Sequence, residues 1–270
     1  MMNQTFIVTT EHRRSTGVAN AVRKEQTIGI CHGEAGVGKT VSARRYANWD
    51  DLKPFINEWS PRSDEDGKHY ALANRSRTVF YTPEVLCRPK DLMDEIRRSQ
   101  TRIGGCIDEH LRQHDTTTPR SMNGISKLVE LLIIDEAERL TPTALEILRD
   151  NHERIHLAMI RIGMPGIDQR FPRYPQLYSR LGYSHRYRAL GRKELLFVLD
   201  RHRKRPGRNL DPDDFTDAQA IAAIERITRG NFRLLERLFP QITRILKINQ
   251  LETIADDVIE AAASILVIGN

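Results

Sequence analysis

The residues from Gly33 to Thr40 read Gly-Glu-Ala-Gly-Val-Gly-Lys-Thr, which fits the phosphate-binding pattern G-x-x-x-x-G-K-[ST]. Glycines let such a loop wrap closely enough for its backbone N–H groups to face phosphate oxygens. In this pattern Lys39 neutralises the β- and γ-phosphates, and the Thr40 hydroxyl coordinates Mg²⁺. The motif predicts a nucleoside triphosphate site contacted by Gly33, Glu34, Ala35, Gly36, Val37, Gly38, Lys39 and Thr40.

A pair of carboxylates, Asp135 and Glu136, follows the largely apolar run at 128–134. Such a run predicts a strand covered on both faces of a parallel sheet, and a carboxylate at its end can hold Mg²⁺. We therefore expect Asp135 to share the metal with Thr40, and Glu136 to orient and deprotonate an attacking water. Together the two motifs predict that the chain binds ATP and Mg²⁺ and hydrolyses the nucleotide.

Two other groups of residues could hold a metal by their types alone. His152-Glu153-Arg154-Ile155-His156 matches the zinc-protease pattern H-E-x-x-H. It falls where a helix passes into a strand, however, and no third ligand stands at a recognisable spacing. Cys106, His110 and His114 recur at every fourth residue, for which an exposed amphipathic face is the simpler interpretation. We therefore expect no metal apart from Mg²⁺.

The elements that must position the phosphate and carboxylate motifs alternate between strands and helices. We expect strands at 27–32, 78–82, 128–134, 157–162 and 185–190, and helices at 18–24, 39–49, 90–102 and 141–154. This alternation implies right-handed crossovers and a three-layer α/β core with a parallel sheet. The stretch at 53–77 has two prolines and no clear period, so it predicts a surface insertion.

From residue 192 onward the pattern becomes helical throughout. Helices are expected at 192–204, 216–228, 231–248 and 251–266. We therefore divide the chain into an N-terminal arm at 1–26, a P-loop core at 27–191 that includes the insertion, and a small all-helical lid domain at 192–270.

The composition is that of a globular chain, with 270 residues of which 39% are hydrophobic and 29% are charged. No apolar run approaches the roughly 18 residues that span a bilayer, and the first ten residues lack the pattern of a signal peptide. Cys31, Cys87 and Cys106 show no paired spacing, which favours a reduced compartment. We therefore expect a cytoplasmic protein with no membrane partner.

Positive charge is concentrated between Arg170 and Arg208, where 12 Lys and Arg residues stand against Glu194 and Asp200. This stretch carries a net charge of +10, whereas the whole chain carries +6. A basic surface favours phosphate-rich partners, although a solvated face is the alternative. The cluster at 201–208 could equally serve DNA, a subunit interface or solubility.

The order of these motifs resembles the AAA+ family of ATPases over about residues 10–255. The resemblance implies that Arg180 is an arginine finger for the nucleotide of a neighbouring subunit, with Arg170 and Arg173 as competitors for that role. It also implies that Arg233 is a sensor-2 arginine, which contacts the γ-phosphate of its own chain from the helical lid.

One stretch departs from the pattern of that family. The strand end at 163–166 reads Gly-Met-Pro-Gly, where the family usually offers a polar sensor-1 residue. We therefore expect weaker positioning of the attacking water and slow turnover.

Four strings are similar to those of transposition ATPases of the TniB, TnsC and MuB kind. They are Leu-Ile-Ile-Asp-Glu-Ala-Glu-Arg-Leu (132–140), Ile-Gly-Met-Pro-Gly (162–166), Tyr-Pro-Gln-Leu-Tyr-Ser-Arg (174–180) and Gly-Asn-Phe-Arg (230–233). The similarity implies an ATP-dependent homo-oligomer, as a ring or helical filament, on double-stranded DNA. That assembly would recruit and stimulate a transposase at a site chosen with a target-selection protein.

The DNA contacts implied by this similarity are Lys90, Arg97, Arg98 and Arg102, which would bind phosphates without reading bases. Two alternatives share the same ATP site. One is a replication initiator or helicase loader, and the other is an ATPase that assembles protein complexes without binding DNA.

Overall fold

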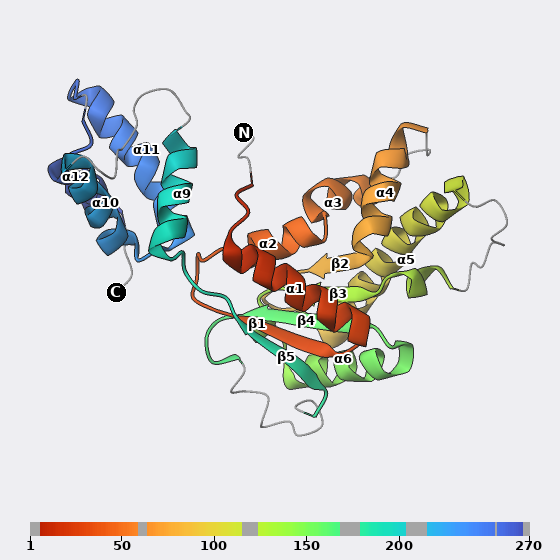
Figure 1. Ribbon diagram of the computed structural model, residues 1–270. Coiled ribbons are helices and arrows are strands. Elements are labelled where there is room, and N and C mark those ends of the chain that lie inside the picture. The colour runs from red at the N-terminus through yellow and green to blue at the C-terminus, as the bar shows by residue number, and fades with distance from the viewer. Residues whose placement is uncertain are drawn as a thin grey trace. The chain divides into compact units, whose positions relative to one another are not determined.

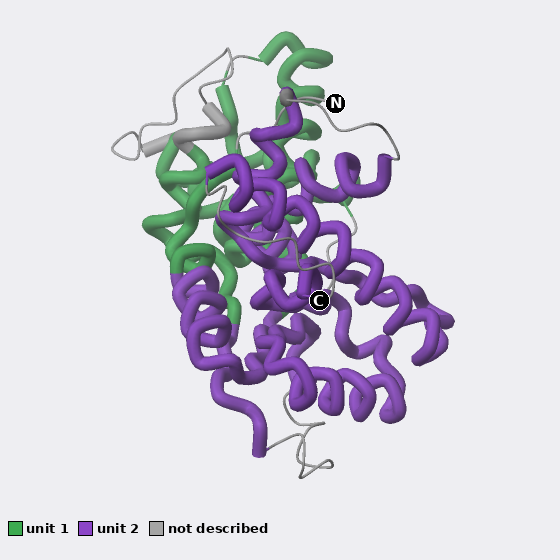
Figure 2. Tube along the Cα trace, turned by 90° about the vertical axis from the view of Figure 1, so that its right-hand side faces the viewer, with its two compact units in different colours: residues 1–13, 34–38, 187–270 green, residues 14–33, 39–186 purple. Residues whose placement is uncertain are grey.

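The computed structural model describes residues 6–58, 64–114, 124–167, 179–203, 215–251 and 253–266. Its tertiary contacts divide the chain into two compact units, which Figure 2 colours separately. The sheet unit comprises residues 14–33 and 39–186. The helical unit comprises residues 1–13, 34–38 and 187–270.

The sheet unit is built on five parallel strands in the order β2–β3–β4–β1–β5 (Figure 1). Their bounds are Ile28–His32 (β1), Thr78–Tyr81 (β2), Leu131–Ile134 (β3), Ala158–Gly163 (β4) and Leu181–Arg186 (β5). Every residue of β2, β3 and β4 is buried, as expected for parallel strands covered on both faces. The predicted α/β core with a parallel sheet is confirmed.

Helices flank this sheet in Figure 1. Their bounds are Thr10–Glu25 (α1), Lys39–Tyr46 (α2), Trp49–Asn57 (α3), Gly67–Ser76 (α4), Pro89–His114 (α5) and Pro142–Ile155 (α6). Short 3₁₀ turns lie at Asp64–Asp66 (η1), Ile125–Leu128 (η2) and Ala137–Arg139 (η3). The helix α6 begins where the sequence predicts a helix. Thr141 is its N-cap and accepts a hydrogen bond from the N–H of Ala144.

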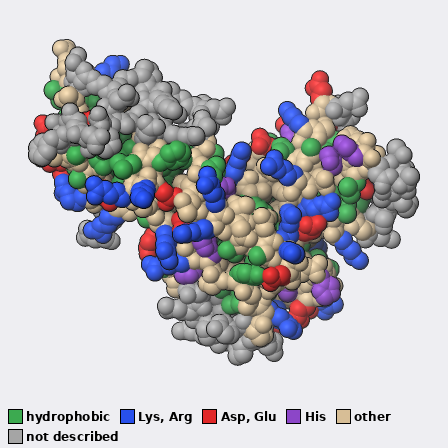
Figure 3. Space-filling model, in the orientation of Figure 1, with side chains coloured by type: hydrophobic (Ala, Val, Ile, Leu, Met, Phe, Trp, Pro, Cys, Tyr) green, Lys and Arg blue, Asp and Glu red, His purple; other side chains and the backbone are tan. Residues whose placement is uncertain are grey.

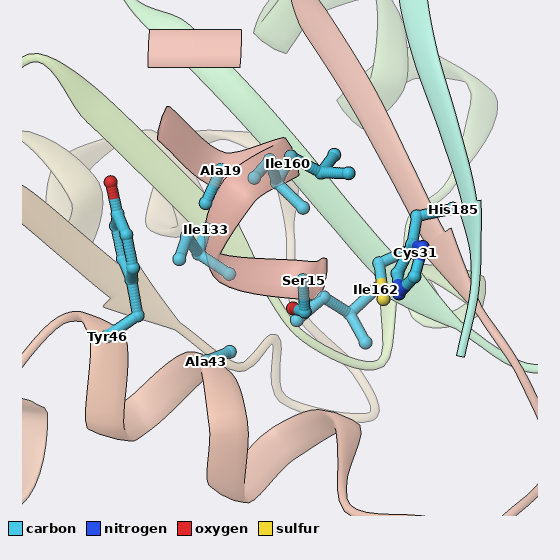
Figure 4. A pocket seen from close by; sticks show the side chains of 10 residues that line it. Ser15, Ala19, Cys31, Ala43, Tyr46, Ile133, Ile160, Ile162 and His185 are labelled. Atoms are coloured by element: carbon cyan, nitrogen blue, oxygen red, sulfur yellow. The ribbon is translucent and has the colours of Figure 1, made fainter. Parts of the chain in front are cut away.

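The helices α1 and α2 pack on one face of the sheet, where Figure 4 shows a small cavity between them and the strands. Ala19 of α1 and Ala43 of α2 face Ile133 and Ile160 of the strands across it. The cavity measures about 20 Å³, which is room for about one water molecule. This face of the sheet is therefore closely packed.

The stretch at 53–77, predicted as a surface insertion without regular structure, contains the end of α3 and all of α4 among its described residues. The helix α3 accommodates Pro54 in its interior. Trp49 and Leu52 are among four side chains that it buries, and burial of apolar surface outweighs a local helix breaker.

The last strand is predicted at 185–190, whereas β5 spans Leu181–Arg186 and therefore lies four residues earlier. Among the described strands it pairs only with β1, so it lies at an edge of the sheet. Its side chains alternate between half-buried and exposed, and it therefore lacks a continuous apolar run. At the other end of the chain, α1 begins at Thr10 rather than near Val18.

The helical unit contains Arg192–Arg203 (α9), Phe215–Thr228 (α10), Phe232–Ile248 (α11) and Asp256–Ser264 (α12). Its core is formed by buried side chains of all four helices, among them Val198, Ile224, Leu238 and Ile259. The start of the chain belongs to the same unit, because Ile7 packs on this core. The predicted helical C-terminal region is confirmed. None of the described helices is both long and apolar enough to cross a bilayer.

Gly104 lets α5 lie directly against the backbone of η2. A Cβ placed on Gly104 would stand 2.1 Å from the carbonyl oxygen of Ile125, whereas a Cβ on Gly105 meets nothing within 4 Å. We expect Gly104→Ala to lower the free energy of unfolding by about 1–3 kcal/mol, because the η2 backbone must move. The control Gly105→Ala should raise it by up to about 1 kcal/mol through helix propensity. Urea unfolding measures both, and equal effects would contradict this account of the packing.

Candidate functional site

The glycine-rich loop occupies the carboxyl end of an interior strand, where open α/β sheets bind ligands. It follows β1 directly, and α2 begins at Lys39. Gly36 and Gly38 adopt φ values of +80° and +106°, which side-chain-bearing residues rarely tolerate. The Lys39 Nζ donates a hydrogen bond to the Gly33 carbonyl oxygen at 2.5 Å. The strand–loop–helix context that the phosphate motif requires is therefore present.

The two predicted motifs meet in a hydrogen bond of 2.7 Å from Thr40 Oγ1 to Asp135 Oδ2. Asp135 follows β3, and β4 lies between β3 and β1 in the sheet. Burial, which leaves Asp135 4% exposed, raises the pKa of its carboxyl, while the Thr40 hydrogen bond opposes that shift. A hydroxyl and a carboxylate oxygen side by side are ligand types that Mg²⁺ takes in triphosphate sites, so these residues fit a magnesium ion.

Glu136 adjoins Asp135, but its carboxylate forms an ion pair with Arg139. The backbone of Glu136 is left-handed, with φ +48°, and its side chain is partly exposed. Arg139 also donates a hydrogen bond of 2.8 Å to the carbonyl oxygen of Pro83, in the loop that follows β2. One guanidinium thus joins the predicted general base to that loop.

Arg180 lies at the opposite end of β1 from the phosphate loop. Its carbonyl oxygen accepts hydrogen bonds from the Thr27 hydroxyl at 3.1 Å and the Ile28 N–H at 3.4 Å, at the start of β1. The five residues of β1 put about 16 Å between that point and Gly33. The Arg180 side chain is held by Glu153, to which its Nε donates at 3.0 Å. Arg180 is therefore placed away from the phosphate loop of its own chain.

Within the helical unit, Asn231 binds the loop segment at 34–38 while it caps α11. Its Nδ2 donates to the Ala35 carbonyl oxygen at 2.8 Å. Its Oδ1 accepts from the N–H groups of Arg233 and Leu234, which completes the N-cap. The Arg233 N–H also donates to the Gly36 carbonyl oxygen at 3.0 Å. The predicted sensor-2 arginine is thus tied to the loop through its backbone, and its side chain is exposed.

The four predicted DNA contacts on α5 form two groups rather than one row. Arg98 and Arg102 lie four residues apart and share one side of the helix, whereas Lys90 and Arg97 share another side, about 100° away. Arg98 and Arg102 line a cavity of about 290 Å³ at the carboxyl end of β2. Lys90 and Arg97 are exposed elsewhere on the helix surface.

The H-E-x-x-H match does not place its two histidines on one helical face. His152 is buried, and its Nδ1 is 2.8 Å from the carbonyl oxygen of Leu157. His156 ends α6 with φ +52°. In the described part of the chain, no group of three or more His, Cys, Asp or Glu residues is arranged to hold a metal ion.

Some of the site residues were not predicted from the sequence. Asn231 could have been found, because Asn directly before an apolar helical period is an N-cap signal. Arg139 stands three residues after Glu136, a spacing that allows contact within one turn. Several predicted features fall outside the described residues, namely Arg170, Arg173, most of the 174–180 string and the side chains at 201–208.

A family model described as an AAA domain matches residues 22–171, which is more than half of the chain. A protein of Staphylococcus aureus described as a potential ATP-binding protein is 38% identical over 274 residues. That alignment covers 99% of this chain and 98% of the relative. The chain belongs to the AAA-domain family.

Two solved structures share the fold of this AAA-domain protein. RuvB of Thermotoga maritima, described as a Holliday junction branch migration motor, superposes with a TM-score of 0.57 at 17% identity. ORC2 of Aeropyrum pernix, in ADPNP and ADP complexes, superposes with a TM-score of 0.55 at 13% identity. Each likeness covers 97% of this chain and 70% of the other. They confirm the predicted AAA+ fold, and at these identities they show the fold alone.

The double role of Asn231 in this AAA-domain protein can be separated by substitution. Asn231→Ser keeps a good N-cap acceptor but is too short to reach the Ala35 carbonyl, whereas Asn231→Ala loses both. We expect Asn231→Ser to unfold near the wild-type temperature and to bind ATP about fivefold more weakly, which corresponds to about 1 kcal/mol for one hydrogen bond. Asn231→Ala should lose stability as well, by about 1 kcal/mol.

Thermal unfolding without nucleotide and calorimetric titration with Mg·ATP measure the two effects. Wild-type ATP affinity in Asn231→Ser would show that the contact with Ala35 does not shape the loop.

Proposed function

We propose that this AAA-domain protein binds and hydrolyses ATP as a homo-oligomer on double-stranded DNA. In this proposal the assembly recruits and stimulates a transposase at a chosen target site. The observation that carries the ATPase part is the 2.7 Å contact between Thr40 and Asp135, beside a lysine-bearing loop at a strand end.

The residues have distinct roles in the proposed hydrolysis. The N–H groups of the loop at 33–40 and the Lys39 ammonium hold the phosphates. Thr40 and Asp135 would hold Mg²⁺, which supplies neutralisation of phosphate charge when bound. Glu136 orients and deprotonates water once its ion pair with Arg139 opens. Arg233 contacts the γ-phosphate from its own chain.

The DNA part of the proposal rests on charge and on motif similarity. The stretch at 170–208 carries a net charge of +10, and α5 adds Arg98 and Arg102 beside a cavity. A fold shared with RuvB, a Holliday junction motor, is consistent with work on DNA. The transposase and the target-selection protein are inferred from the strings at 132–140, 162–166, 174–180 and 230–233. A cytoplasmic location is consistent with Cys31, Cys87 and Cys106, none of which forms a disulfide.

The nucleotide state should control DNA binding. We expect a random-sequence duplex at low salt to be bound with ATP or a slowly hydrolysed analogue, and to be released with ADP. Lys39→Ala should abolish this dependence, because the phosphates lose their cation. Glu136→Gln should retain binding, lower turnover by about 10²–10⁴-fold and trap the assembly on DNA.

Fluorescence anisotropy with a labelled duplex and negative-stain microscopy measure binding and assembly. Duplex binding of equal strength with ATP and with ADP would favour an initiator or loader ATPase. ATP-dependent assembly without any duplex binding would favour an ATPase that builds protein complexes.

Arg180 should complete the site of a neighbouring subunit, because the length of β1 separates it from its own phosphate loop. A guanidinium is suited to the charge that spreads over phosphoryl oxygens in the transition state. We expect Arg180→Ala alone and Lys39→Ala alone to be inactive, and an equimolar mixture to regain part of the ATPase rate. Arg154→Ala, which removes an exposed arginine paired with Asp150, is the matched control. Failure to complement at every mixing ratio would count against action in trans.

A further inference from the structure

A cavity of about 290 Å³ opens in the sheet unit, between α2, α3, α5 and the carboxyl end of β2. Its volume is close to the lower limit for small-ligand sites. Four basic side chains line it, Arg44 of α2, Lys53 of α3, and Arg98 and Arg102 of α5. Figure 3 shows Lys and Arg side chains over α3 and the adjoining part of α5. Only the two α5 residues were among the DNA contacts predicted from the sequence.

Two of these guanidinium groups are anchored by neighbouring side chains. Arg44 donates from its Nε to Asp50 at 2.7 Å, and Arg102 donates from its Nη1 to the Asn57 amide oxygen at 3.1 Å. A guanidinium has five N–H donors, so donors remain for a ligand after these bonds. Anchoring also reduces the side-chain entropy that a ligand would otherwise have to overcome.

Carboxylates also line the cavity, and they limit what it can bind. Glu95 is hydrogen-bonded with Tyr81, and burial together with Glu95 raises the pKa of the Tyr81 hydroxyl. Glu84 lies at the exposed start of the loop after β2. Four cations stand against these two carboxylates and against Asp50, the partner of Arg44, which leaves one net positive charge and hydrogen-bond donors on three different helices. Such a site suits a compact, multiply oxygenated anion better than an apolar ligand.

We propose that this cavity is a phosphate-binding site. The inference rests on the proposed DNA binding for its first source, a backbone phosphate of the duplex. A free phosphate-bearing small molecule is the second source of the same chemistry. Arg44, Lys53, Arg98 and Arg102 converge on the phosphate, and the site lies at the carboxyl end of β2, where α/β folds place their ligands.

Duplex binding at several salt concentrations, with a slowly hydrolysed ATP analogue, tests the first source. We expect Arg98→Gln and Lys53→Gln each to weaken binding several-fold and to reduce the slope of log affinity against log salt by about one. Arg97→Gln removes the adjacent cation on the same helix, outside the cavity, and should weaken binding less. The exposed control Arg154→Gln on α6 should bind as the wild type does. Equal losses in Arg97→Gln and Arg98→Gln would overturn the assignment to the cavity.

Titration with inorganic phosphate tests the site independently of DNA. Trp49 lines the cavity, so its fluorescence reports occupancy, and saturating ADP keeps the phosphate loop filled. We expect a saturable change in the wild type and in Arg97→Gln, and its loss in Arg98→Gln and Lys53→Gln. If inorganic phosphate binds in this way but no duplex is bound, the ligand is a free phosphate-bearing molecule, and only the proposal of DNA binding is refuted. The phosphate site would be overturned if the wild-type fluorescence does not change with phosphate and if Arg98→Gln and Lys53→Gln also bind the duplex no more weakly than Arg97→Gln.

Discussion

The contact between Thr40 and Asp135 is the constraint on which the site depends. These residues are 95 positions apart in the sequence. They meet because Asp135 follows β3, Thr40 follows the loop after β1, and the two strands are separated in the sheet by β4 alone. The register of β3 on β4 and of β4 on β1 fixes the level at which both loops leave the sheet. A slip of one residue would move every side chain of a strand to the other face of the sheet, where its shape would no longer match the packing, so close packing on both faces maintains that register. The chemistry of the site is therefore set by the packing of the sheet.

Local chemistry in the sequence predicts much of this arrangement. The phosphate loop, the strand before Asp135 and the Thr141 cap each depend on residues within a few positions of one another. The sequence was misleading where tertiary packing or position in the sheet decides the outcome. Buried aromatic and aliphatic side chains make α3 a helix in spite of Pro54. The strand β5 has no apolar run because it lies at an edge.

Contacts between distant segments could not be predicted in the same way. Nothing near Arg98 in the sequence indicates that Arg44 and Lys53 face the same cavity. The loop after β2 is a further example, because the Tyr81 carbonyl accepts the Asp135 N–H at 2.8 Å and the Pro83 carbonyl accepts Arg139. The end of β2 is thus hydrogen-bonded directly to Asp135, and Arg139 connects the loop after it to Glu136. Such links arise from the pairing of β2 with β3, which cannot be deduced from the order of residues in the sequence.

The edge position of β5 has a consequence for the behaviour of the protein at high concentration. One side of this strand has no neighbouring strand among the described residues, and an open edge invites pairing with a second molecule. Arg180 precedes the strand and Arg186 ends it, and both side chains are exposed. Two such edges brought together would place both arginines of each molecule along the same seam. Glu153 offsets the charge of Arg180, and the repulsion between the Arg186 side chains opposes continuous sheet growth. Positive charge beside β5 therefore opposes aggregation through this open edge.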